Sequence, residues 1–454
     1  MDATYTVSVL DFGAVPDSRE FQDGAIQAAI DCCFTRGGGT VEVPAGVYPV
    51  RAMRLRSGVT LLLRSGAVLK ASRNPEDYFI LKNDTLEPVN PAELERNADT
   101  DKTIKPYGLR WHNAVIRAFD AENIAVIGEP GAMIDGCNCY DEQGEEGYRG
   151  PHAFSIHRCR HVVLRGYTIR NSANWAHSTW ESRNILVEDV TVEGGHDGVH
   201  FRGCDDVVVR RCRLYTGDDC VAGFNNRNVL VEDCELNTAC SAFRFGGTNV
   251  LVHHCHIFAP ARFLFRGSLT KEEKQAGING TNAAEDKNHR YNMLSLFTYF
   301  ADFTQKVRYP ASNIVIRDCR VEGADRFLHF NYSGNEIWQL NEPLADIRFE
   351  NIEATGISMP LTAYGDTEKP ASVTFENVRF SMRPGFEDVP FMHMANCREV
   401  CFDNVEVANS RSRHLVKCWS DPASCRFTFR KVTAPMAPED YVVRTDEPFV
   451  CTPI

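Results

Sequence analysis

The segments VVVRRCRL (207–214) and VLVEDCEL (229–236) share one eight-residue pattern. Each has apolar residues at alternating positions, then a polar pair, then a small or apolar residue that opens a second alternation. A period of two is typical of β-strands, so each copy predicts two short strands joined by a bend. Further copies are VVLRGYTI (162–169), ILVEDVTV (185–192), VLVHHCHI (250–257), IVIRDCRV (314–321), IRFENIEA (347–354), VTFENVRF (373–380), VCFDNVEV (400–407) and FTFRKVTA (427–434).

The spacing of the copies predicts a solenoid. In chain order, the first five copies start at residues 162, 185, 207, 229 and 250, which are 23, 22, 22 and 21 residues apart. A β unit of this length cannot bury its own apolar face, whereas stacking one coil on the next does. The expected fold is therefore all-β, a parallel β-helix with coils ~4.8 Å apart; propeller blades need about 40–45 residues. One position of the repeat predicts a ladder of small interior side chains, held by Val190, Cys212, Cys234, Cys255 and Cys319.

The ends of a solenoid need capping, and the segment FQDGAIQAAIDCCFTRGGG (21–39) predicts an amphipathic helix for this purpose. We expect an N-terminal cap over about 1–50 and a single domain over 1–454. Three excursions interrupt the coils, at 85–112, 137–152 and about 268–310. Loops of this length are usually functional walls or lids.

Composition limits the partners. The net charge of −12 argues against a nucleic acid or an anionic membrane as partner. The N-terminus shows no secretory signal, and no apolar run approaches the ~18 residues of a membrane span. The 17 cysteines then indicate reduced thiols in the cytoplasm. Cys137 and Cys139 have no second pair at zinc-like spacing, so we expect neither a metal nor a cofactor. Open solenoid faces are compatible with a homo-oligomer.

The segment TGDDCVAGF (216–224) places two aspartates side by side before an apolar run. Counting seven residues from the ladder position leads from Val190 to Asp197 and from Cys212 to Asp219. Asp197 and Asp219 are therefore expected on adjacent coils, with Asp218 beside them, within ~5 Å. An isolated Asp-Asp pair is usually a solvated turn, but the register with Asp197 favours a functional site.

Three carboxylates this close cannot all ionise at low cost, so one pKa is expected to rise and another to stay low. This asymmetry suits glycoside hydrolysis, which needs an acid at the leaving oxygen and a base or nucleophile opposite.

Several segments together resemble family 28 glycoside hydrolases, the polygalacturonase-like enzymes. They are SVLDFGAVPD (8–17), GGGTVEVPAGVY (37–48), GGHDGVHFRGC (194–204), which is similar to the family's Asn-Thr-Asp-Gly motif, and TGDDCVAGF (216–224), which is similar to its Gly-Asp-Asp motif. The resemblance implies a right-handed parallel β-helix, no metal, and hydrolysis of pectin bonds with inversion. It also implies that Asp218 is the general acid, and that Asp197 and Asp219 hold and deprotonate the attacking water. A separation of ~5 Å would by itself suggest retention; the resemblance outweighs it.

The sugar-binding motifs depart from the family pattern. The family's Gly-His-Gly aligns with Cys240-Ser241-Ala242, so its histidine is absent. Its Arg-x-Lys, which grips the sugar carboxylate, aligns near Leu264-Phe265-Arg266, where Arg266 replaces the lysine. The catalytic carboxylates are thus kept while the sugar site is altered.

Other residues can replace the lost contacts. The repeat frame places His200 and Arg244 ten residues past the ladder position, with Arg202 two beyond His200, and arginine binds carboxylates bidentately. His196 adjoins Asp197. Trp175 and His177 lie one coil earlier, where aromatic rings either stack on a sugar or pack in the core. The candidate substrate-binding residues are His196, His200, Arg202, Ser241, Arg244, Arg266, Trp175 and His177.

The sequence therefore predicts a glycosidase acting on pectin-like or related oligosaccharides, with exo-action on short substrates. One alternative is a polysaccharide lyase or epimerase on the same fold, and an unsaturated product would identify a lyase. The other is a non-catalytic carbohydrate-binding β-helix, for which binding without turnover would be unchanged in Asp218→Asn.

Overall fold

The computed structural model describes residues 5–79, 112–280, 285–286, 288–301, 307–332, 342–419 and 425–445. It consists of two compact units: unit 1 is Met1–Gly217 with Phe263–Thr281, and unit 2 is Asp218–Arg262 with Asn282–Ile454. The expectation of one domain over 1–454 stays a prediction. The excursion expected at 85–112 lies outside the described residues, apart from His112.

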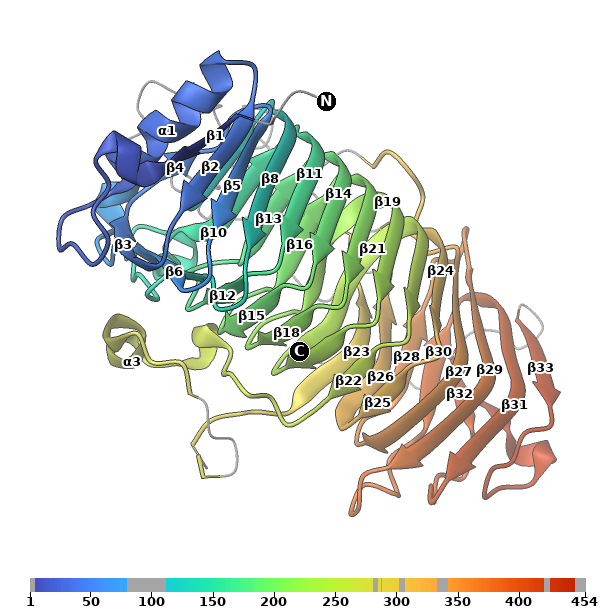
Figure 1. Ribbon diagram of the computed structural model, residues 1–454. Coiled ribbons are helices and arrows are strands. Elements are labelled where there is room, and N and C mark those ends of the chain that lie inside the picture. Colours follow the sequence, from blue (N-terminus) through green and yellow to red (C-terminus); the bar gives the residue numbers. More distant parts are fainter. Residues whose placement is uncertain are drawn as a thin grey trace. The chain divides into compact units, whose positions relative to one another are not determined.

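Unit 1 is a stack of coils whose strands pair in parallel with those of the next coil (Figure 1). The strands form three columns. The first column contains β1 (Thr6–Ser8), β2 (Gly39–Val43), β5 (Val59–Leu63), β8 (Glu122–Gly128), β11 (Arg160–Arg165), β14 (Arg183–Glu188) and β17 (Asp205–Arg210). The second contains β3 (Gly46–Val50), β6 (Ala67–Ala71), β9 (Met133–Asp135), β12 (Thr168–Arg170), β15 (Thr191–Gly194) and β18 (Arg213–Thr216). The third contains β4 (Met53–Arg54), β7 (Ala114–Phe119), β10 (His152–His157), β13 (His177–Trp180) and β16 (Val199–Arg202).

Unit 2 repeats this arrangement with longer strands. Its first column contains β19 (Val221–Glu232), β21 (Ser241–His253), β24 (Ser312–Arg317), β27 (Asp346–Ile357), β29 (Ala371–Met382), β31 (Cys397–Ala408) and β33 (Arg426–Arg430). The shorter strands are β20 (Glu235–Thr238), β22 (His256–Phe258), β23 (Met293–Tyr299), β25 (Arg320–Glu322), β26 (Ala324–Asn331), β28 (Leu361–Tyr364), β30 (Met392–Ala395), β32 (Val416–Cys418) and β34 (Val442–Arg444). The expected parallel β-helix is thus confirmed.

The polar pair of the repeat forms the corner between two strands. Its second residue has a φ near +50° in most copies, as at Asp189 (53°), Asp233 (55°) and Asn377 (53°). This left-handed conformation is costly for most residues and least so for glycine, asparagine and aspartate. The copy at 162–169 has Gly166 there, with a φ of 81°. The repeat therefore encodes the bend as well as the strands.

Equivalent side chains stack inside the coils. Val190 and the cysteines at the same repeat position are buried, as expected. In unit 2 the rings of Phe349, Phe375, Phe402 and Phe429 form a second ladder, with successive centroids 5.4, 5.1 and 5.4 Å apart. Each coil thus buries the apolar face of the next.

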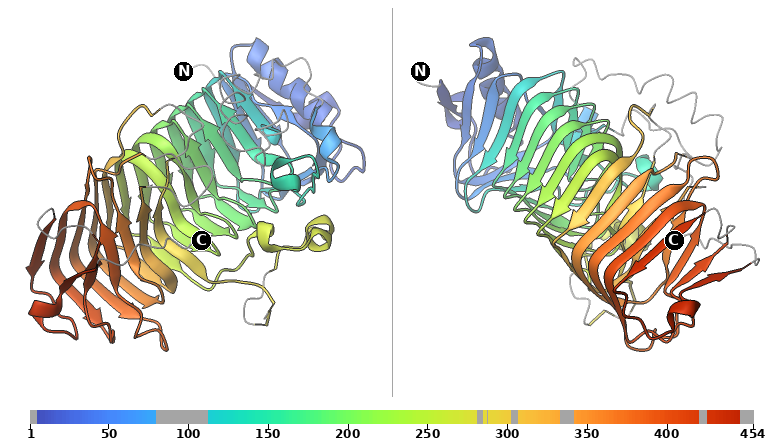
Figure 2. Two further views of the ribbon diagram at one scale, coloured as in Figure 1. Left: turned by 180° about the vertical axis from the view of Figure 1, so that it is seen from behind. Right: turned by 90° about the vertical axis from the view of Figure 1, so that its right-hand side faces the viewer.

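The helix expected at 21–39 is α1 (Asp23–Thr35), which packs beside β1, β2 and β5 at the N-terminal end of unit 1 (Figure 2). Ile26, Ala29, Ile30 and Cys33 form its buried face. The second helix is α3 (Lys271–Ala276). Short 3-10 turns occupy Val9–Phe12, Pro75–Phe79, Glu145–Gly147, Arg266–Ser268 and Pro438–Asp440. Within the described parts of the chain, neither helix has the length and apolar character needed to cross a bilayer.

The excursion predicted at 268–310 is partly wrong, because it contains strand β23 (Met293–Tyr299). This strand pairs with β21 and β26 as a regular strand of unit 2. Both of its faces are largely buried, so its sequence lacks the apolar–polar alternation by which the other strands were recognised.

The phenylalanine ladder gives a test of core packing. Phe375 is fully buried between two rings, so Phe375→Ala should cost about 3–5 kcal/mol of stability. Phe386, which is 41% exposed, is the matched control, and Phe386→Ala should change stability little. Urea unfolding followed by circular dichroism measures both; equal midpoints for the two variants would contradict the ladder.

Candidate functional site

Two successive turns of unit 1 follow strands β15 and β18. Strands β15 and β18 pair in register up to Gly194 and Thr216, and the Gly217 N–H donates to the Gly194 carbonyl over 2.8 Å. The first turn continues into Gly195, His196 and Asp197. The side chains of His196 and Asp197 are both buried there.

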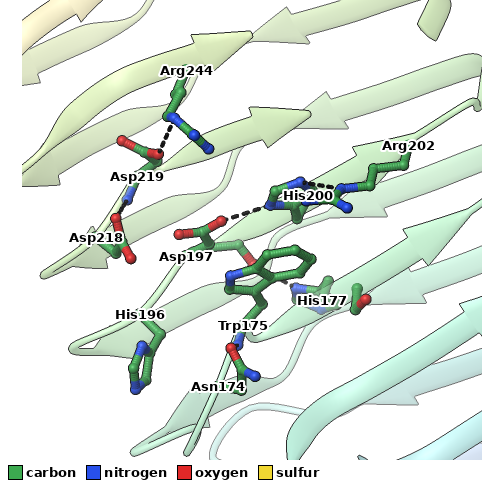
Figure 3. A network of polar contacts seen from close by, with 12 residues as sticks. Asn174, Trp175, His177, His196, Asp197, His200, Arg202, Asp218, Asp219 and Arg244 are labelled. Atoms are coloured by element: carbon green, nitrogen blue, oxygen red, sulfur yellow. Dashed lines mark hydrogen bonds and ion pairs between the residues drawn. The ribbon is translucent and has the colours of Figure 1, made fainter. Parts of the chain in front are cut away.

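Asp197 is held by a chain of hydrogen bonds from strand β16. Its Oδ2 lies 2.7 Å from His200 Nδ1, and Arg202 Nε donates to His200 Nε2 over 3.1 Å (Figure 3). His200 and Arg202 are two residues apart on one strand, so they share a face. All three side chains are at least 95% buried.

Two tryptophan rings pack against the hydrogen-bonded residues His200 and Arg202. The Trp175 ring is stacked on the His200 ring, with centroids 3.6 Å apart and planes 9° from parallel. The Arg202 guanidinium lies over Trp180, 4.7 Å from the ring centroid, and 5.2 Å from the Trp175 ring. Trp175 therefore packs against His200 on one face and is 5% exposed, which leaves little of it for a sugar.

His177 was expected among the substrate-binding residues, but the structure places it in the interior. Its Nε2 lies 3.0 Å from Tyr167 Oη, its Nδ1 lies 3.1 Å from the Gly198 carbonyl, and its ring stacks on Phe154. Residues alternate between the two faces of a strand, and His177 is paired with Val199 rather than with His200. It therefore points away from the face that carries His200 and Arg202.

A buried arginine lies against the first turn. Arg266 is fully buried, and its N–H donates to the Gly195 carbonyl over 3.2 Å. Its Nη2 donates to the Lys274 carbonyl over 3.2 Å, but its Nε and Nη1 have no hydrogen-bond acceptor among the described residues. Burial lowers the pKa of Arg266 to about 10, so the guanidinium stays charged at neutral pH.

His196 offers another buried donor. Arg149 Nη1 lies 3.1 Å from His196 Nδ1 and can only donate, so the ring proton is on Nε2. This Nε2 has no hydrogen-bond partner within the described parts of the chain. Burial, followed by the charges of Arg149 and Arg266, lowers the pKa of His196 well below its usual value, so the ring is neutral. Unmet buried donors are costly unless a ligand or water supplies acceptors.

Positive charge exceeds negative charge around these donors. Arg149 pairs with Glu146, whose Oε2 lies 3.1 Å from its Nε. Burial raises the pKa of Glu145 to about 8, so this carboxyl is largely neutral at pH 7. Lys274 Nζ lies 4.4 Å from the Tyr148 ring centroid, and Arg266 forms no ion pair among the described residues. This surplus of positive charge favours an anion.

Two glycines make this arrangement possible. A Cβ atom on Gly195 would lie 2.3 Å from Arg266 Cγ, and one on Gly217 would lie 1.8 Å from the Leu264 carbonyl oxygen. The segment around 263–268 can therefore lie directly on the two turns only because neither residue has a side chain. Hydrogen bonds from Arg73 to the Gln275 carbonyl and from Asn138 to the Gly277 carbonyl hold the following residues.

In unit 2, Asp218 and Asp219 precede strand β19. Asp219 Oδ1 accepts the Ser241 N–H over 2.9 Å, and Arg244 Nε lies 3.9 Å from Asp219 Oδ2 (Figure 3). The Arg244 guanidinium also lies 3.6 Å from the Phe300 ring centroid. The Asp219 N–H donates to Asp218 Oδ1 over 3.1 Å. Asp219 is buried, whereas Asp218 is partly exposed.

Glu145, Arg149 and Lys274 are functional candidates that the sequence pattern did not reveal. They lie in the excursions at 137–152 and 268–310, outside the repeat frame that located the aspartates. The excursions themselves were the signal, since long loops between coils often carry function.

Comparison with known proteins confirms the resemblance. Residues 94–240, which include all three aspartates, match the model of "Glycosyl hydrolases family 28". The chain is 26% identical over 230 residues to a "Probable polygalacturonase" of Vitis vinifera, which covers 48% of this chain and 44% of the relative. It is 28% identical over 249 residues to the "Exo-poly-alpha-D-galacturonosidase" of Dickeya chrysanthemi, which covers 47% and 41%. The chain thus spans less than half the length of these two relatives.

A solved structure supports the fold. The exopolygalacturonase of Thermotoga maritima superposes with a TM-score of 0.60 at 18% identity, covering 84% of this chain and 87% of that one. This agrees with the expected right-handed parallel β-helix.

The contact at Gly217 gives a test of the site's construction. Gly217→Ala should displace the segment around Leu264 and cost about 1–3 kcal/mol, since a methyl group has no room there. Thermal unfolding and limited proteolysis within 263–280 measure the effect. Gly24→Ala is the control, because a Cβ at Gly24 on α1 meets nothing within 4 Å; equal behaviour of both variants would contradict this packing.

Proposed function

We propose that this chain, whose residues 94–240 match glycosyl hydrolase family 28, is a glycosidase that cleaves pectin-like oligosaccharides next to a uronic acid. The observation that carries the proposal is the pair of buried donor groups beside Asp197, on Arg266 and His196, for which no described residue supplies an acceptor. A uronate carboxylate supplies both the acceptors and the negative charge that this place lacks.

The proposal requires that Asp197 lie near Asp218 and Asp219. The register of β15 and β18 supports this, because Gly217, which hydrogen bonds to Gly194, is followed directly by the two aspartates. Continuing this register by three residues pairs Asp197 with Asp219, as the repeat frame predicts. In the proposed arrangement the three carboxylates meet at the corner of two adjacent coils.

The carboxylates have different surroundings, which suits different roles. Asp197 accepts from His200 and Asp219 accepts from the Ser241 N–H, so both are stabilised as anions. Two nearby negative charges favour protonation of the third group. We therefore assign the general acid to the more exposed Asp218, and the holding and deprotonation of the water to Asp197 and Asp219, as the family resemblance implies.

The proposed carboxylate grip is Arg266 with His196. Arg202 donates to His200, and Arg244 lies beside Asp219, so these two arginines are better placed to hold the catalytic groups than the substrate. Ser241 likewise supports Asp219 through its N–H. Inversion follows from the resemblance, and exo-action on short substrates is supported by the segment 263–268, which covers the turns. The mechanism uses no metal or cofactor.

We also propose a cytoplasmic location. The cysteines of the described residues are free thiols, as is usual in a reducing compartment.

The acid and base assignments predict large losses of activity. Asp218→Asn and Asp197→Asn should each lower kcat by about 10²–10⁴-fold, because each removes one proton-transfer group. Release of reducing ends from oligogalacturonides measures the effect. Asp189→Asn, at an exposed corner, is the control and should keep activity. Near-wild-type turnover in either site variant would refute the mechanism, and an unsaturated product would indicate a lyase instead.

The grip predicts a change of substrate preference. Arg266→Met should lower kcat/KM for uronides by about 10²-fold while leaving any turnover of neutral aryl glycosides nearly unchanged, because only the uronide loses a charged partner. Removing a buried charge need not destabilise the protein, and melting temperature checks this. Lys271→Met, at an exposed ion pair on α3, is the control. Cleavage of neutral sugars alone by the wild type would reject the uronide assignment.

A further inference from the structure

The hydrogen bond between Arg202 and His200 determines the proton position on the histidine. An arginine Nε always carries a hydrogen, so at 3.1 Å it donates to a lone pair on His200 Nε2. The imidazole proton is therefore on Nδ1, which donates to Asp197 Oδ2 over 2.7 Å. If the ring were an imidazolium, its Nε2–H would face the Arg202 N–H, and two donors cannot hydrogen bond to each other. This arrangement favours the neutral ring.

A neutral donor and a cation affect a general base differently. An imidazolium beside Asp197 would form an ion pair and make the carboxylate a weaker base, whereas a neutral N–H orients the carboxylate without adding a positive charge beside it. The protonation state of His200 thus determines how strong a base Asp197 can be toward water.

The surroundings hold this arrangement rigidly. Trp175 stacks on the His200 ring, and Trp180, which lies against Arg202, donates through Nε1 to Ser178 Oγ over 3.0 Å. Ser178 and His200 are paired on β13 and β16, and so are Trp180 and Arg202. The histidine can therefore neither turn over nor exchange its partners without disturbing two strands.

We infer that Arg202 is a positioning residue that fixes His200 as a neutral Nδ1–H donor, and thereby keeps Asp197 an ionised, oriented base. This inference rests on the proposed function for its catalytic consequence. It assigns to Arg202 and His200 a task other than sugar binding, which the sequence had suggested for both.

Other titratable groups lie near the hydrogen bonds that link Arg202, His200 and Asp197. Their titration must be distinguished from that of His200. In unit 1 these include Glu145, Arg149 and His152, whose ring centroid lies 5.3 Å from that of Trp175. They also include His112, which packs against Trp180 and whose pKa burial lowers to about 3, so that it stays neutral in the acid range tested. The pKa of Glu145, raised to about 8 by burial, keeps it neutral throughout the acid range. His152→Gln serves as the reference variant for this buried histidine. In the proposed arrangement Asp219 and Arg244 of unit 2 would also lie nearby.

The pH dependence of kcat tests the inference. In the wild type, kcat should fall on the acid side of its pH profile as a carboxylate becomes protonated, near pH 4. This fall is the acid limb of the profile. In Arg202→Met, His200 is free to bind a proton as the pH falls, so the limb should move up to about pH 6.5, and kcat at pH 5 should fall about 30-fold below its plateau. Arg202→Lys, which restores a donor, should return the limb toward the wild-type position. Arg170→Met, at an exposed ion pair with Glu193, should leave the profile unchanged.

A spectroscopic readout is independent of activity. In protein with ¹⁵N-labelled histidine, the His200 signals, assigned by their loss in His200→Asn, should show a protonated Nδ1 and a bare Nε2 from pH 5 to 7.5. A wild-type His200 that titrates in this range, or is protonated on Nε2, would overturn the inference, even if Arg202→Met does not fold. An unchanged kcat profile in a folded Arg202→Met would overturn it while leaving the hydrolase proposal intact. Absence of any glycosidase activity would reject the proposed function, and the nitrogen signals would still decide the tautomer.

Discussion

Parallel backbone pairing from one coil to the next, residue for residue, is the constraint on which the rest of the structure depends. Val162, Ile185 and Val207 are paired in this way in unit 1, and Phe349, Phe375 and Phe402 in unit 2. Because the register is kept, a residue type that recurs in the repeat reaches the same place in every coil. A slip of one residue would turn each ladder from the interior to the surface. The interior ladders are therefore a consequence of this pairing rule.

The candidate site lies at the turns, where residues are outside the strand pairing and the repeat restricts their identity least. Gly195 and Gly217 carry no side chain, and the backbone of 263–266 takes the space. This brings together a fully buried guanidinium and a neutral imidazole whose donors find no acceptor on the residues that the structure describes. Such groups reduce stability, and the surrounding coils must compensate for them. That cost is understandable at a place where an anionic ligand supplies the missing acceptors.

The two buried aspartates are held by different means. Asp197 accepts from a histidine whose proton is set by an arginine, whereas Asp219 accepts a backbone N–H and lies near the Arg244 guanidinium. A neutral donor preserves the basicity of a carboxylate, and a nearby cation reduces it. Two aspartates that look alike in sequence therefore differ chemically, and the difference comes from the strands that follow each turn.

The sequence by itself determined the coil, its corners, the capping helix and the repeat positions of Asp197, Asp218 and Asp219, because all of these follow from a short repeat and local backbone preference. Tertiary structure decided the rest. It placed His177 inside, covered Trp175 with His200, made β23 a strand, and brought Arg266 to His196. These outcomes involve residues in excursions or on doubly buried strands. No periodicity fixes the path of such segments, so only packing against the finished coils could position them.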